Sequence, residues 1–316
     1  MKLKYSVTNF AARKQEKLKQ WYRSNIEQSK GIELFNENPV CLNDVQAKIV
    51  QNLDDTGISI INIDELYPDE AWWLKLSSEV EKFTESKEVL EYIKRFKNKE
   101  DTKGFASDHY AKKYLYRKYN VDRKKEIIKF DEPFLQFALE EKILDIAASY
   151  LRSYCKLRMI DLWYNISRGK EQPVLSQKWH RDGEDIRLVK VFLYFNDVDN
   201  ENGPFVYVSG SHQKGKYGKL WPPKTIIEQM YGGVYPEQEE IDSQISNDDI
   251  VTCTGKAGTM IFCDTYGLHR GGHCISGDRI AGNWVYTTPA SFCGNVTRYE
   301  KPDLNLPEKQ KFALSF

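Results

Sequence analysis

The chain has 316 residues, of which 41% are hydrophobic and 29% are charged, a composition typical of a folded globular protein. Lysine plus arginine and aspartate plus glutamate balance at 46 each, so the overall charge gives no reason to expect nucleic acid or an anionic membrane as a partner. These numbers leave the oligomeric state unknown.

The cysteines and the N-terminus point to a compartment. No CxxC pair occurs, so we expect reduced thiols rather than structural zinc or disulfides. The six cysteines are Cys41, Cys155, Cys253, Cys263, Cys274 and Cys293. The first twenty residues, MKLKYSVTNFAARKQEKLKQ, contain no apolar core of a secretion signal, and no later stretch has the length of a membrane span. We therefore predict a cytoplasmic protein.

The first half of the chain, residues 1–155, reads as mostly helical. Residues 10–28 are a basic helix candidate, and 42–57 predict a capped helix that ends at Gly57, directly before a strand at 57–63. Pro68 and the acidic residues after it suit the start of a helix over 68–83. Apolar residues at helical spacing predict one further helix over 131–155.

The segment HYAKKYLYRKYNVDRKK, residues 109–125, combines basic and aromatic side chains. We interpret it as a solvated helix face. The alternative is a wall of the active-site mouth that holds an anionic group of the substrate.

After residue 156 the pattern changes to short β-branched and aromatic segments separated by Gly, Asn, Asp and Pro. Seven or eight such strands without helices between them favour a jelly roll. The fold class is therefore mainly β with α, a double-stranded β-helix flanked by N-terminal helices. Residues 212–247 are too long and polar for a hairpin, and we interpret them as an insertion or lid over one mouth of the barrel.

The stretch SQKWHRDGED, residues 176–185, carries a histidine and an aspartate two positions apart. On a strand, such residues project from the same face, so His180 and Asp182 would both point into the barrel. An imidazole and a carboxylate make two thirds of a 2-His-1-carboxylate site, which leaves coordination positions open for chemistry on Fe(II). By itself an HxD sequence also occurs by chance.

A third ligand is expected from a late strand. The segment IFCDTYGLHRGGH offers His269 or His273, and His269 lies directly beyond the apolar part. Ten residues later, Arg279 opens another predicted strand. An arginine that points into a metal-bearing barrel is costly unless it meets a carboxylate, and a dicarboxylate cosubstrate would supply one. Alternatively, His269 is a core histidine and Arg279 a surface residue.

These segments resemble the phytanoyl-CoA dioxygenase family of Fe(II)/2-oxoglutarate oxygenases. The similarity runs through WHRDG (179–183), VFLYFNDVDNENGPFVYVSGSHQKG (191–215) and GTMIFCDTYGLHRGGHCISGDRIAGNWVY (258–286), so it covers about residues 155–290. It implies a single oxygenase domain over 1–316, with a jelly-roll core at 156–290 and a C-terminal extension at 291–316.

The resemblance also implies roles for individual residues. His180, Asp182 and His269 would be the iron ligands, and Arg279 would pair with the C5 carboxylate of 2-oxoglutarate. Further contacts to the cosubstrate would come from Gln177, Asn165 and Phe192. His273 stands where the family often has asparagine, although the spacing to Arg279 favours His269 as the ligand.

The activity implied is Fe(II)/2-oxoglutarate-dependent hydroxylation of an unactivated C–H bond in a small-molecule metabolite, which consumes O2 and releases succinate and CO2. Desaturation, epimerisation or cyclisation would use the same ligands. Two alternatives come from other classes of protein. A jelly-roll binding protein without catalysis would not need the HxD pair, the distal histidine and the interior arginine together. A zinc hydrolase would use the three ligands but leaves Arg279 unexplained.

Overall fold

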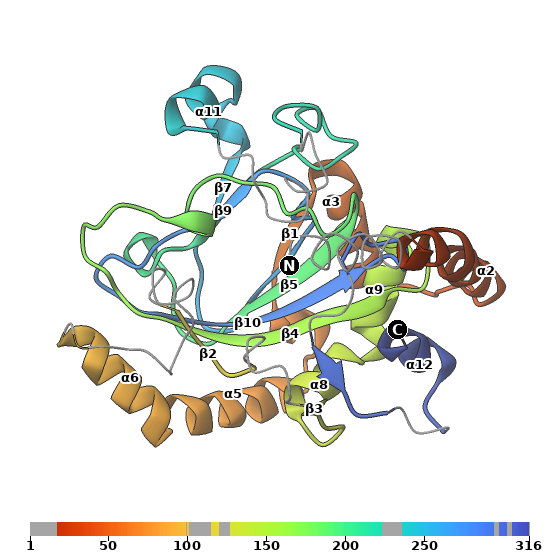
Figure 1. Ribbon diagram of the computed structural model, residues 1–316, viewed down its shortest axis with the longest axis horizontal. Coiled ribbons are helices and arrows are strands. Elements are labelled where there is room, and N and C mark those ends of the chain that lie inside the picture. Colours follow the sequence, from red (N-terminus) through yellow and green to blue (C-terminus); the bar gives the residue numbers. More distant parts are fainter. Residues whose placement is uncertain are drawn as a thin grey trace, which may run out of the picture.

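The structure is a computed structural model that describes residues 18–98, 100, 115–119, 127–222, 236–293, 297–301 and 305–315. Two β-sheets form its centre (Figure 1). The larger sheet has the strand order β1-β8-β5-β10-β4-β2 with antiparallel neighbours throughout, and the smaller has the order β7-β6-β9. The strands are β1 Ile58–Asn62, β2 Leu115–Arg117, β4 Lys156–Asn165, β5 Leu188–Tyr194, β6 Phe205–Val208, β7 Ile250–Cys253, β8 Thr259–Cys263, β9 His269–Gly271 and β10 Arg279–Thr287.

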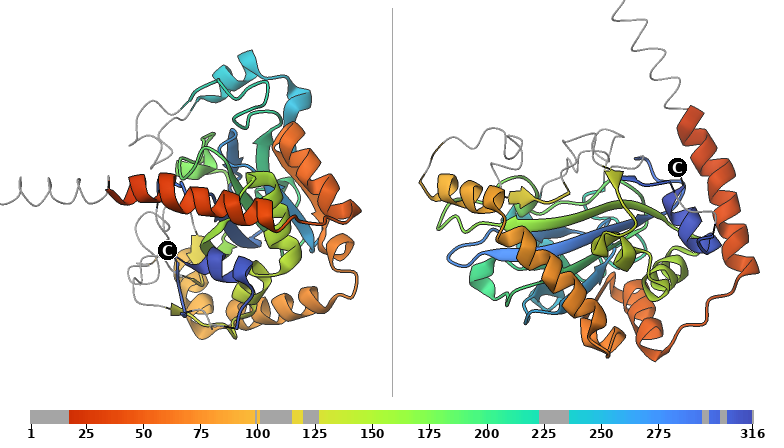
Figure 2. Two further views of the ribbon diagram at one scale, coloured as in Figure 1. Left: turned by 90° about the vertical axis from the view of Figure 1, so that its right-hand side faces the viewer. Right: turned by 90° about the horizontal axis from the view of Figure 1, so that it is seen from below.

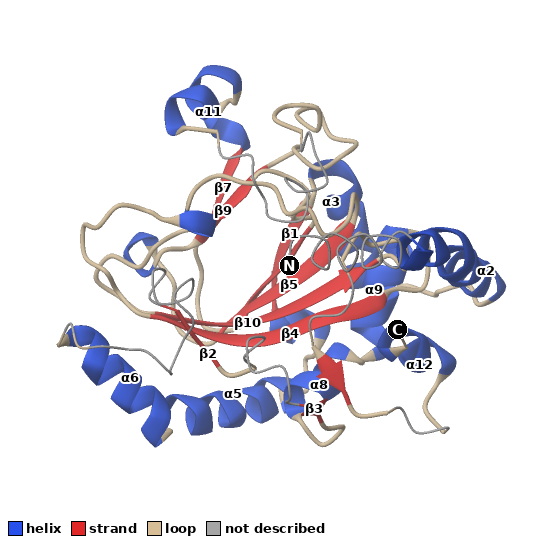
Figure 3. Ribbon diagram, viewed as in Figure 1, coloured by secondary structure: helices blue, strands red, loops and turns tan. Residues whose placement is uncertain are grey.

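Side chains from the facing surfaces of the two sheets pack into one apolar cluster, which includes Phe192 and Ile261 of the larger sheet and Phe205 and Tyr207 of the smaller. This two-layer arrangement is the double-stranded β-helix predicted from the sequence (Figure 3). A further pair of short strands, β3 Ile127–Ile128 and β11 Arg298–Tyr299, pairs in parallel away from this core.

Helices cover the outer face of the larger sheet (Figure 1). Alternation along each strand decides which residues face them: on β10, Arg279 and Ala281 line the interior, whereas Trp284 and Tyr286 pack against the helices. The helices are α2 Gln28–Glu37, α3 Asp44–Thr56, α4 Ile63–Leu66, α5 Ala71–Thr84, α6 Lys87–Lys97, α8 Pro133–Ala138, α9 Glu141–Leu151, α11 Gln238–Gln244 and α12 Glu308–Leu314. A π-helical segment, η1 Arg23–Glu27, precedes α2, and three short 3-10 helices are η2 Leu175–Gln177, η3 Asn200–Asn202 and η4 Asn247–Asp249.

The local signals in the first half place its elements well. Helix α3 begins at a capping box, in which the Asn43 side chain accepts from the Gln46 amide at 2.9 Å, and it ends at Gly57 with a φ of 81°. The described part of the predicted basic helix is helical from residue 18, and the helix continues through η1 and α2. Figure 2 shows this N-terminal helix beside the C-terminal helix α12, and Leu34 of the first packs in one apolar cluster with Phe312 of the second.

The single helix predicted over 131–155 is wrong, because the chain forms α8 and α9 with a break at Glu140. Side chains of β10 donate hydrogen bonds to two carbonyls of α8. The Trp284 indole donates to the carbonyl of Phe134 at 2.9 Å, and the Tyr286 hydroxyl donates to that of Ala138 at 2.8 Å. The carbonyl at the end of this short helix, that of Ala138, is therefore satisfied by the sheet that the helix covers.

Two predicted segments are described only in part. Within 109–125, residues 115–117 form the edge strand β2 with a buried Arg117, and Tyr119 is also buried, so the solvated-helix interpretation is wrong there. Residues 109–114 and 120–125 lie outside the described residues. Within 212–247, residues 223–235 lie outside the described residues, and α11 follows at Gln238. The domain boundaries stay predictions.

All six cysteines are described, and each has a free thiol in this structure. Among the described helices, none combines the length and the apolar character needed to cross a lipid bilayer.

Candidate active site

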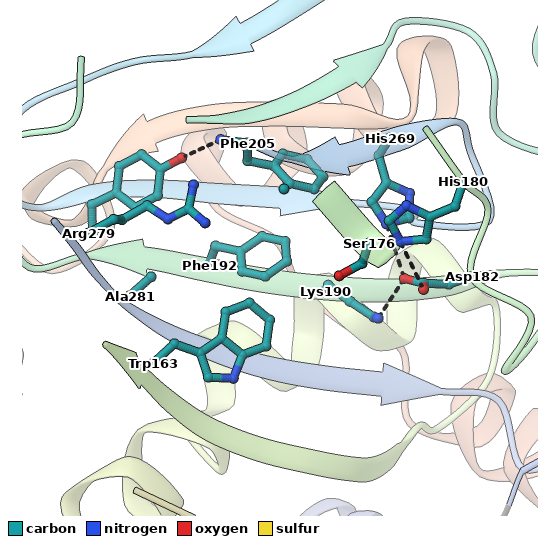
Figure 4. Close-up of a pocket in the computed structure, with 12 residues that line it drawn as sticks. Trp163, Ser176, His180, Asp182, Lys190, Phe192, Phe205, His269, Arg279 and Ala281 are labelled. Carbon is teal, nitrogen blue, oxygen red and sulfur yellow. Dashed lines mark hydrogen bonds and ion pairs between the residues drawn. The ribbon is translucent and has the colours of Figure 1, made fainter. Parts of the chain in front are cut away.

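A cavity of about 230 Å³ lies between the two sheets (Figure 4). Its walls combine aromatic rings with charged groups at both ends. The lining residues are Trp163, Ser176, His180, Asp182, Lys190, Phe192, Tyr194, Phe205, His269, Gly271, Arg279 and Ala281. A largely apolar cavity with a few convergent polar groups is the usual form of a small-molecule site.

The structure brings His180, Asp182 and His269 together at one end of this cavity. One donor atom from each lies within 4.8 Å of the others. The Nε2 atom of His180 is 3.8 Å from one carboxylate oxygen of Asp182, and Nε2 of His269 is 3.3 Å from the other. No other group of three or more His, Cys, Asp or Glu side chains with this spacing occurs in the described part of the chain.

Backbone pairing explains why residues 89 positions apart meet (269 − 180). His180 and His269 exchange both main-chain hydrogen bonds, at 2.9 and 3.0 Å, and the Asp182 amide donates to the carbonyl of Thr265 at 2.9 Å. The HxD segment is thus extended but makes only an isolated bridge, not the regular strand that we predicted. The expected consequence still holds, because His180 and Asp182 both face the cavity.

The orientation of both imidazoles is set from behind. The Nδ1 atom of His180 lies 2.8 Å from the carbonyl of Lys178, and that of His269 lies 2.9 Å from the carbonyl of Gly267. Because a carbonyl only accepts, each Nδ1 donates to it, and each Nε2 is the ring nitrogen that faces the cavity. Burial lowers the pKa of His180 to about 3, which keeps its ring neutral.

Lys190 is a site residue that the sequence reading missed. Its ammonium is buried and lies 2.6 Å from a carboxylate oxygen of Asp182 and 3.5 Å from Glu184. Burial by itself would raise the pKa of Asp182, but Lys190 and His269 hold it well below its usual value. The signal was available, since Lys190 is two positions from Phe192 on one strand and shares its face.

Arg279 lies at the opposite end of the cavity (Figure 4). Its side chain is 6% exposed, and its Nη1 atom has no hydrogen-bond partner among the described residues. The register of β10 and β4 places Asn165 directly opposite, and the amide oxygen of Asn165 is also buried without a partner. Between Arg279 and the three metal-ligand candidates lie the rings of Phe192 and Phe205, whose centroids are 5.0 Å apart.

Two other candidates lie elsewhere. The amide oxygen of Gln177 accepts from Arg168 at 2.9 Å and from the main chain of Val174 at 3.0 Å, and it is Ser176 that lines the cavity. His273 is half-buried and does not belong to the His-Asp-His group. The predicted cosubstrate contact of Gln177 gains no support from this geometry.

Comparison with known proteins identifies the family. The model of the phytanoyl-CoA dioxygenase (PhyH) family matches residues 78–281, well over half of the chain. The chain belongs to this family. The match takes in the HxD segment, His269 and Arg279, together with the second half of α5 and helices α6, α8 and α9, so the family relationship reaches further toward the N-terminus than the resemblance at 155–290 indicated.

Individual relatives are more distant. The ectoine dioxygenase of Bordetella parapertussis is 26% identical over 133 residues, which are 37% of this chain and 42% of the relative. This chain therefore spans less than half of the curated relative it matches. Among solved structures, EctD from S. alaskensis with 2-oxoglutarate and 5-hydroxyectoine is 16% identical at a TM-score of 0.49, with 79% of each chain covered. The epimerase SnoN with Fe3+, alpha ketoglutarate and nogalamycin RO is 16% identical at a TM-score of 0.48, covering 77% of this chain and 83% of that one.

Proposed function

We propose that the protein is an Fe(II)/2-oxoglutarate-dependent dioxygenase that hydroxylates a C–H bond of a small-molecule metabolite. One observation carries the proposal: a single cavity holds a His-Asp-His group at one end and, at the other, a buried arginine that pairs with no carboxylate of the described residues. Membership of a dioxygenase family supports it. A binding protein without catalysis needs neither the His-Asp-His group nor the buried arginine, and a zinc hydrolase needs only the His-Asp-His group.

The donor set fits iron. Two imidazole nitrogens and one carboxylate, all facing one cavity, are the ligands that non-haem Fe(II) oxygenases use, and they leave positions open on the cavity side. His180, Asp182 and His269 would hold the metal. Their hydrogen bonds to main-chain carbonyls and to Lys190 fix the rings and the carboxylate before the metal arrives.

The other residues prepare the cavity for a dicarboxylate. Arg279 would pair with the distal carboxylate of 2-oxoglutarate, since a guanidinium binds a carboxylate through two parallel hydrogen bonds. Phe192 and Phe205 cover the space between, exclude water and so strengthen that pair. Lys190 occupies one oxygen of Asp182, which restrains the carboxylate from rotating.

When bound, iron and 2-oxoglutarate supply the oxidative chemistry, in which O2 is consumed, 2-oxoglutarate yields succinate and CO2, and the substrate gains a hydroxyl group. Asp182 bears on the outcome, because a halogenase needs that coordination position vacant for halide. Desaturation, epimerisation and cyclisation stay open as outcomes on the same ligands. The predicted cytoplasmic location also stays a prediction.

The proposal is tested by reconstituting the purified protein with Fe(II) under anaerobic conditions and then adding 2-oxoglutarate, O2 and a panel of small metabolites. We expect O2 consumption and succinate formation that a substrate from the panel accelerates. Protein loaded with Zn(II) is the control and should form no succinate. Hydrolysis of panel compounds by the Zn(II) form, with no succinate from the Fe(II) form, would overturn the oxygenase assignment.

A further inference from the structure

Arg181, the residue between the two ligands of the HxD segment, is a buried cation with an unusual set of partners. Its side chain is 1% exposed. Burying a guanidinium is costly, and such groups commonly pair with a carboxylate. Here all five of its hydrogen bonds run to main-chain carbonyls, those of Ser211, Tyr217, Leu220 and Tyr266, at 2.6 to 3.2 Å.

The five N–H groups of the fork are therefore matched by five bonds, and the fork joins three segments. The first is the HxD segment itself. The second contains Tyr266, three residues before His269. The third is the loop over residues 211–220, which supplies the other three carbonyls and begins the predicted lid. Because Arg181 points to the opposite side from His180 and Asp182, these bonds hold the metal-ligand segments from their outer side.

A second contact joins the same segments on that side. Trp179 shares the outward face with Arg181, and its indole nitrogen donates to the side chain of Gln238 at 2.9 Å. Arg270, the neighbour of His269, donates to the same oxygen of Gln238 at 3.2 Å and stacks over Trp179 with its guanidinium carbon 4.7 Å from the ring centre. Gln238 is the first residue of α11, so this helix is fixed to the segments that carry His180 and His269.

Apolar packing fills the space between these polar contacts. Trp179, Leu268 and Val208 share one buried cluster with Ile241 and Ile245, which follow in and after α11. The loop 211–220 and α11 thus form an outer layer against which both ligand segments rest. The HxD segment has no such support from a regular β-ladder among the described residues, since it makes only the isolated bridge between His180 and His269.

We infer that Arg181 is a positioning residue of the metal site: its guanidinium uses the carbonyls of the 211–220 loop and of Tyr266 to set the spacing of His180, Asp182 and His269. The inference rests on the proposed function, because it takes these three residues as metal ligands. Residues 212–247 then have a role besides covering the barrel mouth, since their first part is the template for the ligand geometry.

Arginine is needed at this position for its shape as well as its charge. A lysine would keep the positive charge but offers three donors from one atom, so it cannot reach carbonyls on three sides. Arg181→Lys is therefore the informative variant. Arg187→Lys is its matched control, because Arg187 is also a largely buried arginine, but it pairs with the Asp54 carboxylate at 2.5 Å and stacks on Tyr150.

The experiment measures the dissociation constant of Fe(II) by anaerobic titration and the visible absorption spectrum of the Co(II) form, together with the melting temperature of each metal-free variant. We expect Arg181→Lys to weaken metal affinity by about 10- to 100-fold, as loss of a partner behind metal ligands typically does, and to alter the Co(II) spectrum. Arg187→Lys should lower the melting temperature and leave both metal readouts unchanged. Altered metal readouts in Arg181→Lys alone support the inference.

Equal metal affinity and an unchanged Co(II) spectrum in Arg181→Lys would overturn it and leave Arg181 a purely structural residue. If Arg181→Lys does not fold, Gln238→Ala replaces it. Lys256→Ala is the control, since both side chains are exposed and Lys256 lies outside the 211–220 loop and α11. Weaker metal binding in Gln238→Ala alone supports the inference, and equal binding in both contradicts it. A wild-type protein that binds no Fe(II) would contradict the proposed function, a result distinguishable from either outcome.

Discussion

Replacement of Arg279 by alanine should weaken 2-oxoglutarate binding without weakening iron binding. Arg279 is 6% exposed, lines the cavity and has an unpartnered Nη1 atom, so the guanidinium is already desolvated and aimed at the space where a dicarboxylate would lie. Truncating one partner of a buried charge pair typically costs about 2–5 kcal/mol. At about 1.4 kcal/mol for each factor of ten, the dissociation constant should rise roughly 30-fold or more.

The assay is anaerobic titration of the Fe(II) protein with 2-oxoglutarate, followed through the visible charge-transfer band of the chelate. Arg279→Lys should lose less affinity than Arg279→Ala, because it keeps the charge but not the bidentate geometry. Arg187→Ala serves as control, since that arginine pairs with Asp54 away from the cavity. An unchanged binding curve in Arg279→Ala would refute the reasoning. Another cation would then have to bind the distal carboxylate of 2-oxoglutarate, and Lys190 is a cation that lines the cavity.

Three further predictions concern single residues. His269→Ala should lose Fe(II) binding in a direct titration while His273→Ala keeps it, and the opposite pattern would reverse the ligand assignment. Asp182→Ala should abolish hydroxylation in the succinate assay, so retained activity would remove its carboxylate from the metal. Burial raises the pKa of Asp185 from 3.8 to about 7, against hydrogen bonds from Thr288. The protonated Asp185 side chain therefore stabilises the fold below about pH 4, and this contribution is lost as the pH rises toward 7. Across that range the free energy of unfolding should fall more steeply in wild type than in Asp185→Asn.

The sequence was most informative where spacing alone carries the chemistry. His180 and Asp182 project together because extended residues two apart share a face, which holds even without a regular strand. His269 and Arg279 could be placed because each adjoins a strand with a clear apolar pattern. The alternation of side chains along the strand that carries Phe192 also places Lys190 on the same face, so Lys190 could have been predicted as a site residue in the same way.

Features that depend on tertiary contacts escaped prediction. The break at Glu140 interrupts an unbroken helical pattern, and the carbonyl of Ala138 that it frees is bonded by Tyr286, far along the chain. Strand β2 has too few residues to give a periodic signal, and only its pairing with β4 buries Arg117. The partners of Arg181 are main-chain carbonyls, which a pattern of side chains in the sequence cannot predict.

The most direct test of the central claim is the visible spectrum of the wild-type protein under argon, recorded as 2-oxoglutarate is added to the Fe(II) form. The His-Asp-His group and Arg279 at opposite ends of one cavity predict a charge-transfer band that grows and saturates at one 2-oxoglutarate per iron. Absence of that band in protein shown to hold one Fe(II) per chain would contradict the account.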